Sequence, residues 1–348
     1  MCSCVEDEAD RALDVSLAIT GVTLGCNRVP DGVLNRGLRS VSMPLDPQIV
    51  PLVDAVNAAA AEAPPLSEQT VEMRRASYLA LSALAGSGPE LDHVSNERVP
   101  GRDGDIGVRV YRNEGAEGIF VFYHGGGYTI GDLNSHDEVC RQLALESGAT
   151  VVAVDYALAP EQPFPAGIED SWAALQHIAA NRFHYGGGDD VKLVVGGDSA
   201  GGNISAVMAL MARDVGLELA AQLLVYPAVR SDDDSPSMAE NGEGYVLTRE
   251  TMDWFHAQYQ PDHDDVRASP IRARSHEGVA PALVITAEFD PLRDQGIEYA
   301  TVLAAAGVPT VHTNYEGMVH VFFQLGPLVA KGRVAVTQVA ETAKRALA

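Results

Sequence analysis

The sequence predicts an α/β protein in which helices cover both faces of a mainly parallel sheet. From about residue 93 onward, short apolar segments rich in β-branched residues alternate with longer segments of helical periodicity. This alternation is typical of parallel strands joined by crossover helices, and such sheets are buried on both faces. The 348 residues are enough to bury one large core of this kind, with a lid appended to it.

Two helical segments precede the strands. Residues 46–60 and 67–86 have helical spacing, and a pair of prolines separates them. We therefore expect residues 43–92 to form cap helices. Residues 1–42 fit poorly with the pattern of the rest of the chain, and we predict that they form an irregular N-terminal extension outside the fold.

The remaining residues, 93–348, are expected to form the catalytic domain. Strands are expected at 106–111, 119–123, 150–154, 192–195, 222–226, 283–286 and 310–313, with helices at 136–147, 168–181, 203–215 and 294–306. An acidic, irregular stretch of roughly fifty residues follows the fifth strand, and a loop of that length is uncommon unless it forms a lid or a binding loop. We predict a cap insert at about 230–275, in which Trp254 and Phe255 pack as ordinary helix residues.

Composition excludes several partners. A net charge of −24 and a pI near 4.6 argue against binding to nucleic acid or to an anionic membrane. No apolar run approaches the ~18 residues of a membrane helix. The four cysteines match neither a disulfide framework nor a zinc spacing, and the N-terminal residues are acidic where a secretory signal is basic. We therefore expect a cytoplasmic protein with reduced thiols.

One stretch indicates a catalytic nucleophile. Gly197-Asp198-Ser199-Ala200-Gly201 matches the pattern G-x-S-x-G and lies between an apolar β-branched run and a helical segment. This strand–turn–helix context is that of a nucleophile elbow, in which a sharp turn exposes the serine hydroxyl and leaves no room for side chains beside it. Ser199 is therefore the predicted nucleophile.

A serine hydroxyl needs a neighbouring base, and the base needs an acid to orient it. In the hydrolases that use this elbow, the acid and the histidine follow the serine in that order, each just beyond a strand. Asp290 and His320 occupy these positions. Asp294 is the rival acid, but we expect it to cap the following helix, and His312 is expected to be an ordinary strand residue.

A glycine-rich segment supplies candidate donors for an oxyanion. His124-Gly125-Gly126-Gly127 follows the strand at 119–123 and matches the HGGG-type loop of lipases and esterases. Backbone N–H groups in such a loop stabilise a tetrahedral intermediate. We predict donors at Gly125, Gly126 and Ala200, and we expect His124 to brace the loop rather than to act as a base.

Together these motifs resemble the bacterial hormone-sensitive lipase family, the fourth class of bacterial lipolytic enzymes. The likeness covers residues 43–348 and also includes Asp155-Tyr156-Ala157-Leu158-Ala159-Pro160-Glu161. It implies an α/β-hydrolase fold with an eight-stranded sheet and a helical cap, activity on short acyl esters, and often a homodimer. The chain departs from the family's usual residues at Ala157, Gln162 and Val321, of which Val321 follows the predicted base.

The predicted function is that of a serine carboxylesterase that hydrolyses short-chain acyl esters through an acyl-enzyme. Ser199, His320 and Asp290 form the expected triad, and neither a cofactor nor a metal is expected. Two alternatives remain open at this point: a non-catalytic ligand receptor on the same fold, and an amidase or acyltransferase, because the same triad serves any acyl transfer.

Overall fold

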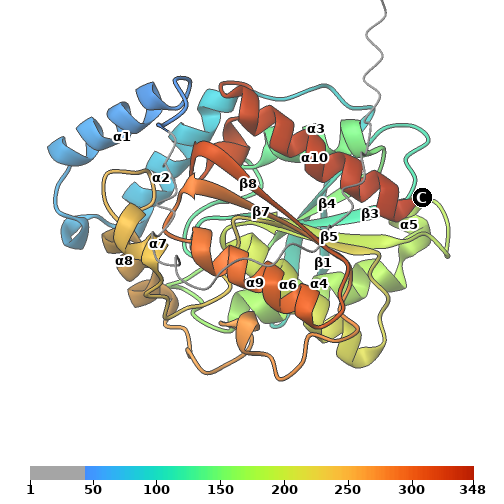
Figure 1. The fold of residues 1–348 in the computed structure, drawn as a ribbon. Coiled ribbons are helices and arrows are strands. Elements are labelled where there is room, and N and C mark those ends of the chain that lie inside the picture. The colour runs from blue at the N-terminus through green and yellow to red at the C-terminus, as the bar shows by residue number, and fades with distance from the viewer. Residues whose placement is uncertain (1–43) are drawn as a thin grey trace, which may run out of the picture. The chain divides into compact units, whose positions relative to one another are not determined.

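The computed structural model describes residues 44–348, so the predicted N-terminal extension lies outside the described residues. This part of the chain contains one sheet of eight strands in the order β1-β2-β4-β3-β5-β6-β7-β8 (Figure 1). β2 runs antiparallel to both β1 and β4, and all other neighbouring pairs are parallel. The mainly parallel eight-stranded α/β architecture is therefore confirmed.

Seven of the strands lie where the sequence predicts them, and β1 is additional. The strands are β1 (His93–Pro100), β2 (Asp105–Arg112), β3 (Ile119–Tyr123), β4 (Thr150–Asp155), β5 (Leu193–Asp198), β6 (Ala221–Val225), β7 (Ala282–Phe289) and β8 (Thr310–Val319). β1 lies at the edge of the sheet and is mostly exposed or half-buried, with Val99 as its one fully buried residue. Its sequence lacks an apolar run because β1 pairs with only one other strand and is packed against the protein on only one of its faces.

Helices lie on both faces of the sheet, as expected. The helices are α1 (Val50–Glu62), α2 (Val71–Ser82), α3 (Asp137–Ser147), α4 (Ala166–Ala180), α5 (Arg182–Gly186), α6 (Ala200–Val215), α7 (Pro236–Asn241), α8 (Arg249–Tyr259), α9 (Arg293–Ala305) and α10 (Ala330–Leu347). Single 3₁₀ turns occur at η1 (Leu66–Glu68), η2 (Ala83–Ala85), η3 (Pro270–Arg272) and η4 (Phe322–Leu325). In Figure 1, α3 and α10 cover one face, and α4, α6 and α9 cover the other.

Two hydrophobic cores result, one on each face, because successive residues of a strand point in opposite directions. In β3, Ile119, Val121 and Tyr123 belong to the core beneath α4 and α6, whereas Phe120 and Phe122 belong to the core beneath α3 and α10. All five side chains are buried. Because the central strands are buried on both faces, they are held in place, and their carboxyl ends lie at one edge of the sheet.

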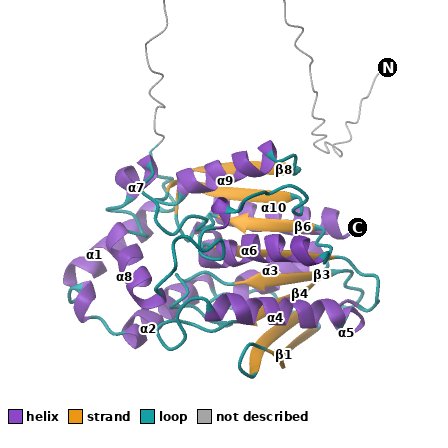
Figure 2. Ribbon diagram, turned by 90° about the horizontal axis from the view of Figure 1, so that it is seen from below, coloured by secondary structure: helices purple, strands orange, loops and turns teal. Residues whose placement is uncertain are grey.

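The cap is built from two separate parts of the chain. α1 and α2 come from before the sheet and α7 and α8 from the insert after β6, and both views show all four at the same end of the molecule (Figures 1 and 2). Thr70 caps the N-terminus of α2, and its hydroxyl accepts the Met73 N–H at 3.3 Å. The Arg74 guanidinium of α2 lies 5.6 Å from the Trp254 ring centre of α8, so the two parts are in contact. The domain boundaries drawn from the sequence remain a prediction.

Between residues 44 and 348, no helix is both long enough and apolar enough to cross a bilayer.

The turn after β5 depends on two close backbone approaches. A Cβ on Gly197 would lie 2.2 Å from the Tyr123 carbonyl oxygen, and one on Gly201 would lie 1.9 Å from the same atom. Real Cβ atoms do not come so close, so glycine is required at both positions. The turn is thus held against the end of β3.

Replacing Gly201 with alanine should destabilise the fold, although alanine usually favours a helix. The added methyl cannot fit beside Tyr123, and we expect the free energy of unfolding to fall by about 2–3 kcal/mol, as for overpacked cores. Denaturant unfolding monitored by circular dichroism measures this. Gly188→Ala is the matched control, because its Cβ would meet only a Val191 methyl at 3.4 Å. Equal stabilities of the two variants would contradict the steric account.

Candidate active site

Ser199 stands at the apex of the turn between β5 and α6. Its backbone has φ 54° and ψ −116°, a combination that is unfavourable for a residue with a side chain. Three backbone hydrogen bonds hold it: the Ser199 N–H donates to Val225 O at 2.9 Å, and the Ser199 carbonyl accepts from Asn203 N at 3.1 Å and Ala228 N at 3.2 Å. Ser199 is only half-buried and follows the last residue of β5, so the turn places it at the carboxyl edge of the sheet.

Asp290 and His320 reach the same place because of the register of the last two strands. Phe289 of β7 pairs with Val319 of β8, and each predicted residue comes directly after its strand. His320 Nδ1 lies 2.7 Å from Asp290 Oδ2, and His320 Nε2 lies 2.9 Å from Ser199 Oγ. The structure therefore brings the three predicted residues together in one hydrogen-bonded chain.

The acid and the histidine are enclosed, whereas the serine is accessible. Asp290 is 0% exposed and His320 4% exposed. The second carboxylate oxygen of Asp290 accepts the Leu292 N–H at 2.8 Å, and the Tyr226 ring lies 4.4 Å from the His320 ring, centre to centre. These contacts hold the imidazole with its Nε2 toward Ser199 Oγ.

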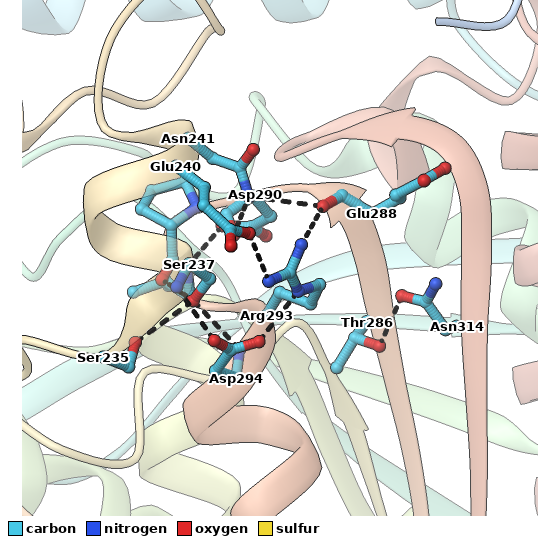
Figure 3. Close-up of polar contacts among 12 residues, drawn as sticks. Ser235, Ser237, Glu240, Asn241, Thr286, Glu288, Asp290, Arg293, Asp294 and Asn314 are labelled. Atoms are coloured by element: carbon cyan, nitrogen blue, oxygen red, sulfur yellow. Dashed lines mark hydrogen bonds and ion pairs between the residues drawn. The ribbon is translucent and has the colours of Figure 1, made fainter. Parts of the chain in front are cut away.

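The cap insert braces the loop that carries Asp290 (Figure 3). Asn241 of α7 directs its side-chain amide to the carbonyl oxygens of Glu288 and Asp290, each at 3.3 Å. Ser237 Oγ donates to Pro291 O at 2.8 Å. The insert is therefore attached to the acid loop by side-chain-to-backbone hydrogen bonds, which restrain the position of the carboxylate.

Asp294, the rival acid, has a different role from either expectation. Its carboxylate accepts the Ser237 N–H at 2.8 Å and the Arg293 Nε–H at 2.8 Å, so it points at α7 and not at His320. It is not a helix cap either, because α9 begins at Arg293 with Leu292 in the capping position. Asp294 instead joins the insert to the first turn of α9. His312 lies in β8 as expected, with Nε2 2.9 Å from Thr286 Oγ1.

The glycine loop after β3 differs from the prediction at one position. The Gly125 N–H donates to Asp198 Oδ1 at 2.9 Å and is therefore not free for an oxyanion. Among residues 44–348, the N–H groups of Gly126, Gly127 and Ala200 have no hydrogen-bond acceptor, that of Ala200 because it begins a helix. The free donors thus start one residue later in the loop than expected.

Phe255 of the cap insert packs against this loop. A Cβ on Gly127 would lie 2.4 Å from atoms of the Phe255 ring, so the ring occupies the space above a bare backbone. Phe255 is only half-buried. Its position next to the free N–H groups differs from the ordinary helix packing predicted for it, because the insert folds back over the loop.

His124 braces the loop as expected. Its Nδ1 lies 2.7 Å from Gly125 O, its carbonyl accepts the Tyr156 hydroxyl at 2.6 Å, and its ring stacks on Tyr156 at 4.4 Å. Burial, assisted by the neighbouring His136, lowers the pKa of His124 to about 4. The ring is therefore neutral near pH 7 and has a purely structural place in the site.

The sequence alone predicts no role for two polar residues of the site. Asp198 stands out in the sequence only as part of the elbow pattern, and Gln324 carries no sequence signal, because its contact with Asp198 depends on the position of η4 in the folded chain. Gln324 Nε2 lies 3.0 Å from Asp198 Oδ2. No group of three or more His, Cys, Asp or Glu side chains within residues 44–348 is arranged to hold a metal ion.

Comparison with known proteins identifies relatives. A sequence model of the Abhydrolase_3 family, described as alpha/beta hydrolase fold, matches residues 120–324. Carboxylesterase NlhH of Mycobacterium tuberculosis is 43% identical over 289 residues, covering 80% of this chain and 90% of its own. Ethyl acetate hydrolase of Pseudomonas putida is 34% identical over 88% of this chain and all of its own. A hyperthermophilic esterase structure from Pyrobaculum calidifontis superposes with a TM-score of 0.82 at 41% identity, covering 87% of this chain and 99% of the other.

The buried His124 predicts how stability depends on pH. Its folded-state pKa of about 4 lies below its ordinary value of 6.5. As the pH falls, the imidazole is therefore protonated at a higher pH in the unfolded chain than in the folded one. The stabilisation is complete above about pH 6.5 and is lost as the pH falls toward 4, with a slope approaching 1.4 kcal/mol per pH unit.

The measurement is urea unfolding at several pH values between 4 and 7. His124→Asn should show a shallower fall in unfolding free energy than the parent protein, whereas the exposed His184→Gln control should follow the parent. If His124→Asn and the parent have the same slope, the ring is not buried in its neutral form.

Proposed function

Because the chain belongs to the Abhydrolase_3 family of the alpha/beta hydrolase fold, the hormone-sensitive lipase-like group, and is a carboxylic ester hydrolase, we propose that it hydrolyses short-chain acyl esters through an acyl-enzyme formed on Ser199. The observation that carries the proposal is the position of the His320 imidazole, 2.9 Å from Ser199 Oγ and 2.7 Å from Asp290 Oδ2. This is the geometry in which a histidine can take the hydroxyl proton while a carboxylate stabilises the resulting cation.

In the proposed reaction Ser199 Oγ attacks the ester carbonyl carbon and His320 takes its proton. The tetrahedral intermediate collapses when His320 returns that proton to the departing alcohol oxygen, which leaves the acyl group on Ser199. His320 then takes a proton from a water molecule whose oxygen attacks the acyl carbon, and it returns this proton to Ser199 Oγ as the bond between that oxygen and the acyl carbon breaks and the acid leaves. Asp290 orients the ring and stabilises the cation that forms on it.

We assign the oxyanion donors to Gly126, Gly127 and Ala200. Gly126 and Ala200 are retained from the sequence prediction, and Gly127 replaces Gly125, whose N–H is taken by Asp198. The support is that these three N–H groups have no acceptor among residues 44–348, that Ala200 follows the serine, and that the glycine loop is bonded through Gly125 to Asp198, the residue before the serine. Donors that are already oriented lower the barrier without reorganisation.

The preference for short acyl chains has two supports. One relative is named for ethyl acetate, a small ester. In addition, Phe255 covers the backbone at Gly127 and narrows the space beside the proposed oxyanion donors. We also retain a cytoplasmic location and a homodimer as proposals, the latter because β8 is an open edge of the sheet with Val311 58% exposed.

Catalysis is favoured over a ligand receptor on the same fold, because a receptor has no need of a histidine aligned on both the serine and the acid. An amidase or acyltransferase would use the same three residues. The esterase relatives favour ester hydrolysis among these activities.

Removing the triad residues should abolish turnover while leaving the fold intact. Ser199→Ala or His320→Ala should lower kcat for p-nitrophenyl acetate by roughly 10⁶, and Asp290→Asn by roughly 10⁴, as in other serine hydrolases. The matched control is Asp294→Asn, a neighbouring carboxylate that binds α7, which should lose far less activity than Asp290→Asn. Near-normal hydrolysis by Ser199→Ala would refute the assignment.

The chain-length dependence should separate an esterase from a lipase. With p-nitrophenyl esters of increasing acyl length, kcat/KM should be highest for acetate and butyrate and about tenfold or more lower for laurate, since an acyl chain too long for the pocket displaces the ester carbonyl from its position beside Ser199. Phe255→Ala should extend the range toward longer acyl groups. A parent enzyme that prefers laurate or triglyceride emulsions would contradict the short-chain proposal.

A further inference from the structure

A buried polar network lies directly behind the nucleophile. Asp198, the residue before Ser199, is 1% exposed, and His136 Nε2 lies 3.1 Å from its Oδ1. Burial alone would disfavour the charged carboxylate, but His136 and the Gly125 N–H outweigh this effect, and the pKa of Asp198 is lowered. The site therefore keeps a negative charge next to the catalytic serine, with no direct part in the proposed chemistry.

This carboxylate sets the position of the glycine loop. Asp198 Oδ1 accepts the Gly125 N–H at 2.9 Å, and a Cβ on Gly125 would lie 2.4 Å from Asp198 Oδ2. The loop backbone is thus in direct contact with the side chain. Because Gly126 follows immediately, any shift of the carboxylate moves the first free N–H of the loop.

Gln324 connects the same carboxylate to the cap. It lies on η4, four residues after His320, and its Nε2 is 3.0 Å from Asp198 Oδ2, 2.6 Å from the Tyr78 hydroxyl oxygen and 2.5 Å from His136 Nε2. A side-chain amide nitrogen has two hydrogens, which can be donated to the Tyr78 and Asp198 oxygens, while His136 Nε2 faces Asp198 Oδ1 at 3.1 Å. Tyr78 belongs to α2, so one amide joins the N-terminal cap to the elbow.

Tyr78 also lines a cavity. A cavity of about 410 Å³ lies between α2 and the loops after β3 and β4, and Tyr78 and Ser135 are among the residues that line it. Burial and the charge of Asp198 raise the pKa of Tyr78, so the hydroxyl remains neutral and serves Gln324 as an acceptor.

We propose that Gln324 and Tyr78 are positioning residues that couple the docking of α2 to the geometry of the oxyanion hole, through Asp198 and Gly125. The inference rests on the proposed function, because it concerns the donors of that same site. When α2 is seated, Tyr78 holds one hydrogen of the Gln324 amide and the other is directed at Asp198. When α2 is displaced, the amide loses one acceptor and can rotate away from the carboxylate that holds the loop.

The test compares Tyr78→Phe and Gln324→Met with Tyr315→Phe. Tyr315 is a matched control, because its hydroxyl also bonds a glutamine, Gln338, at 2.8 Å, away from the site between β8 and α10. Each variant is assayed for kcat and KM with p-nitrophenyl acetate and for the Ki of an alkyl trifluoromethyl ketone. The ketone forms a tetrahedral adduct whose oxyanion needs the same donors as the transition state.

Tyr78→Phe and Gln324→Met should each lower kcat by about 10- to 100-fold, less than or comparable to the loss of one oxyanion donor, while KM changes by less than about threefold. The ketone Ki should rise by a similar factor, and the double variant should be no worse than Gln324→Met, because both act through one path. Tyr315→Phe should match the parent.

Unchanged kcat and ketone Ki in Tyr78→Phe would overturn the inference, as would a loss confined to KM. If Gln324→Met does not fold, Tyr78→Phe, which removes one oxygen atom from the cap, still decides the question. A failure of the proposed function gives a different result: Ser199→Ala would then remain active, whereas failure of this inference alone leaves Ser199→Ala inactive and Tyr78→Phe fully active.

Discussion

The hydrogen bond from Ser199 Oγ to His320 Nε2 is the interaction on which the rest of the site depends. It is 2.9 Å long and joins residues 121 positions apart in the chain, so no local structure can create it. It exists because the central strands are buried on both faces and end at a common edge, and because Phe289 and Val319 are in register. A shift of β8 by one residue would turn the imidazole to the other face of the sheet.

Presenting the serine at the turn also costs the fold some stability. Ser199 adopts an unfavourable backbone conformation, and the turn persists because Val225, Asn203 and Ala228 hold it by hydrogen bonds while glycines let the backbone press against β3. Such local strain survives only where the surroundings determine it completely. On the other side, the cap insert binds the acid loop through Ser237 and Asn241. The core and the cap together therefore fix the three residues from opposite sides.

Local sequence patterns predict much of this arrangement. Apolar runs predict the buried strands, and Ser199, Asp290 and His320 are each recognisable from the turn that follows a strand. The edge strand β1 is missed because exposure removes its hydrophobic signal, and α10 is missed although Val336, Val339 and Ala343 give it an apolar face. Gly125 is misassigned as a free donor because only the folded chain reveals that Asp198 takes its N–H. Gln324 could not be found, since its partners Tyr78, His136 and Asp198 lie on α2, just before α3 and on β5.

The most direct test of the central claim is mass spectrometry of the enzyme quenched during turnover of p-nitrophenyl acetate. The account predicts a burst of p-nitrophenol close to one equivalent per active chain, with the acetyl group on the peptide that contains Ser199, and loss of both in His320→Ala. Steady hydrolysis without a burst or label could reflect fast deacylation, so a phosphonate ester that cannot deacylate serves in the same experiment. Stable modification of any residue other than Ser199, or none at all, would contradict the account.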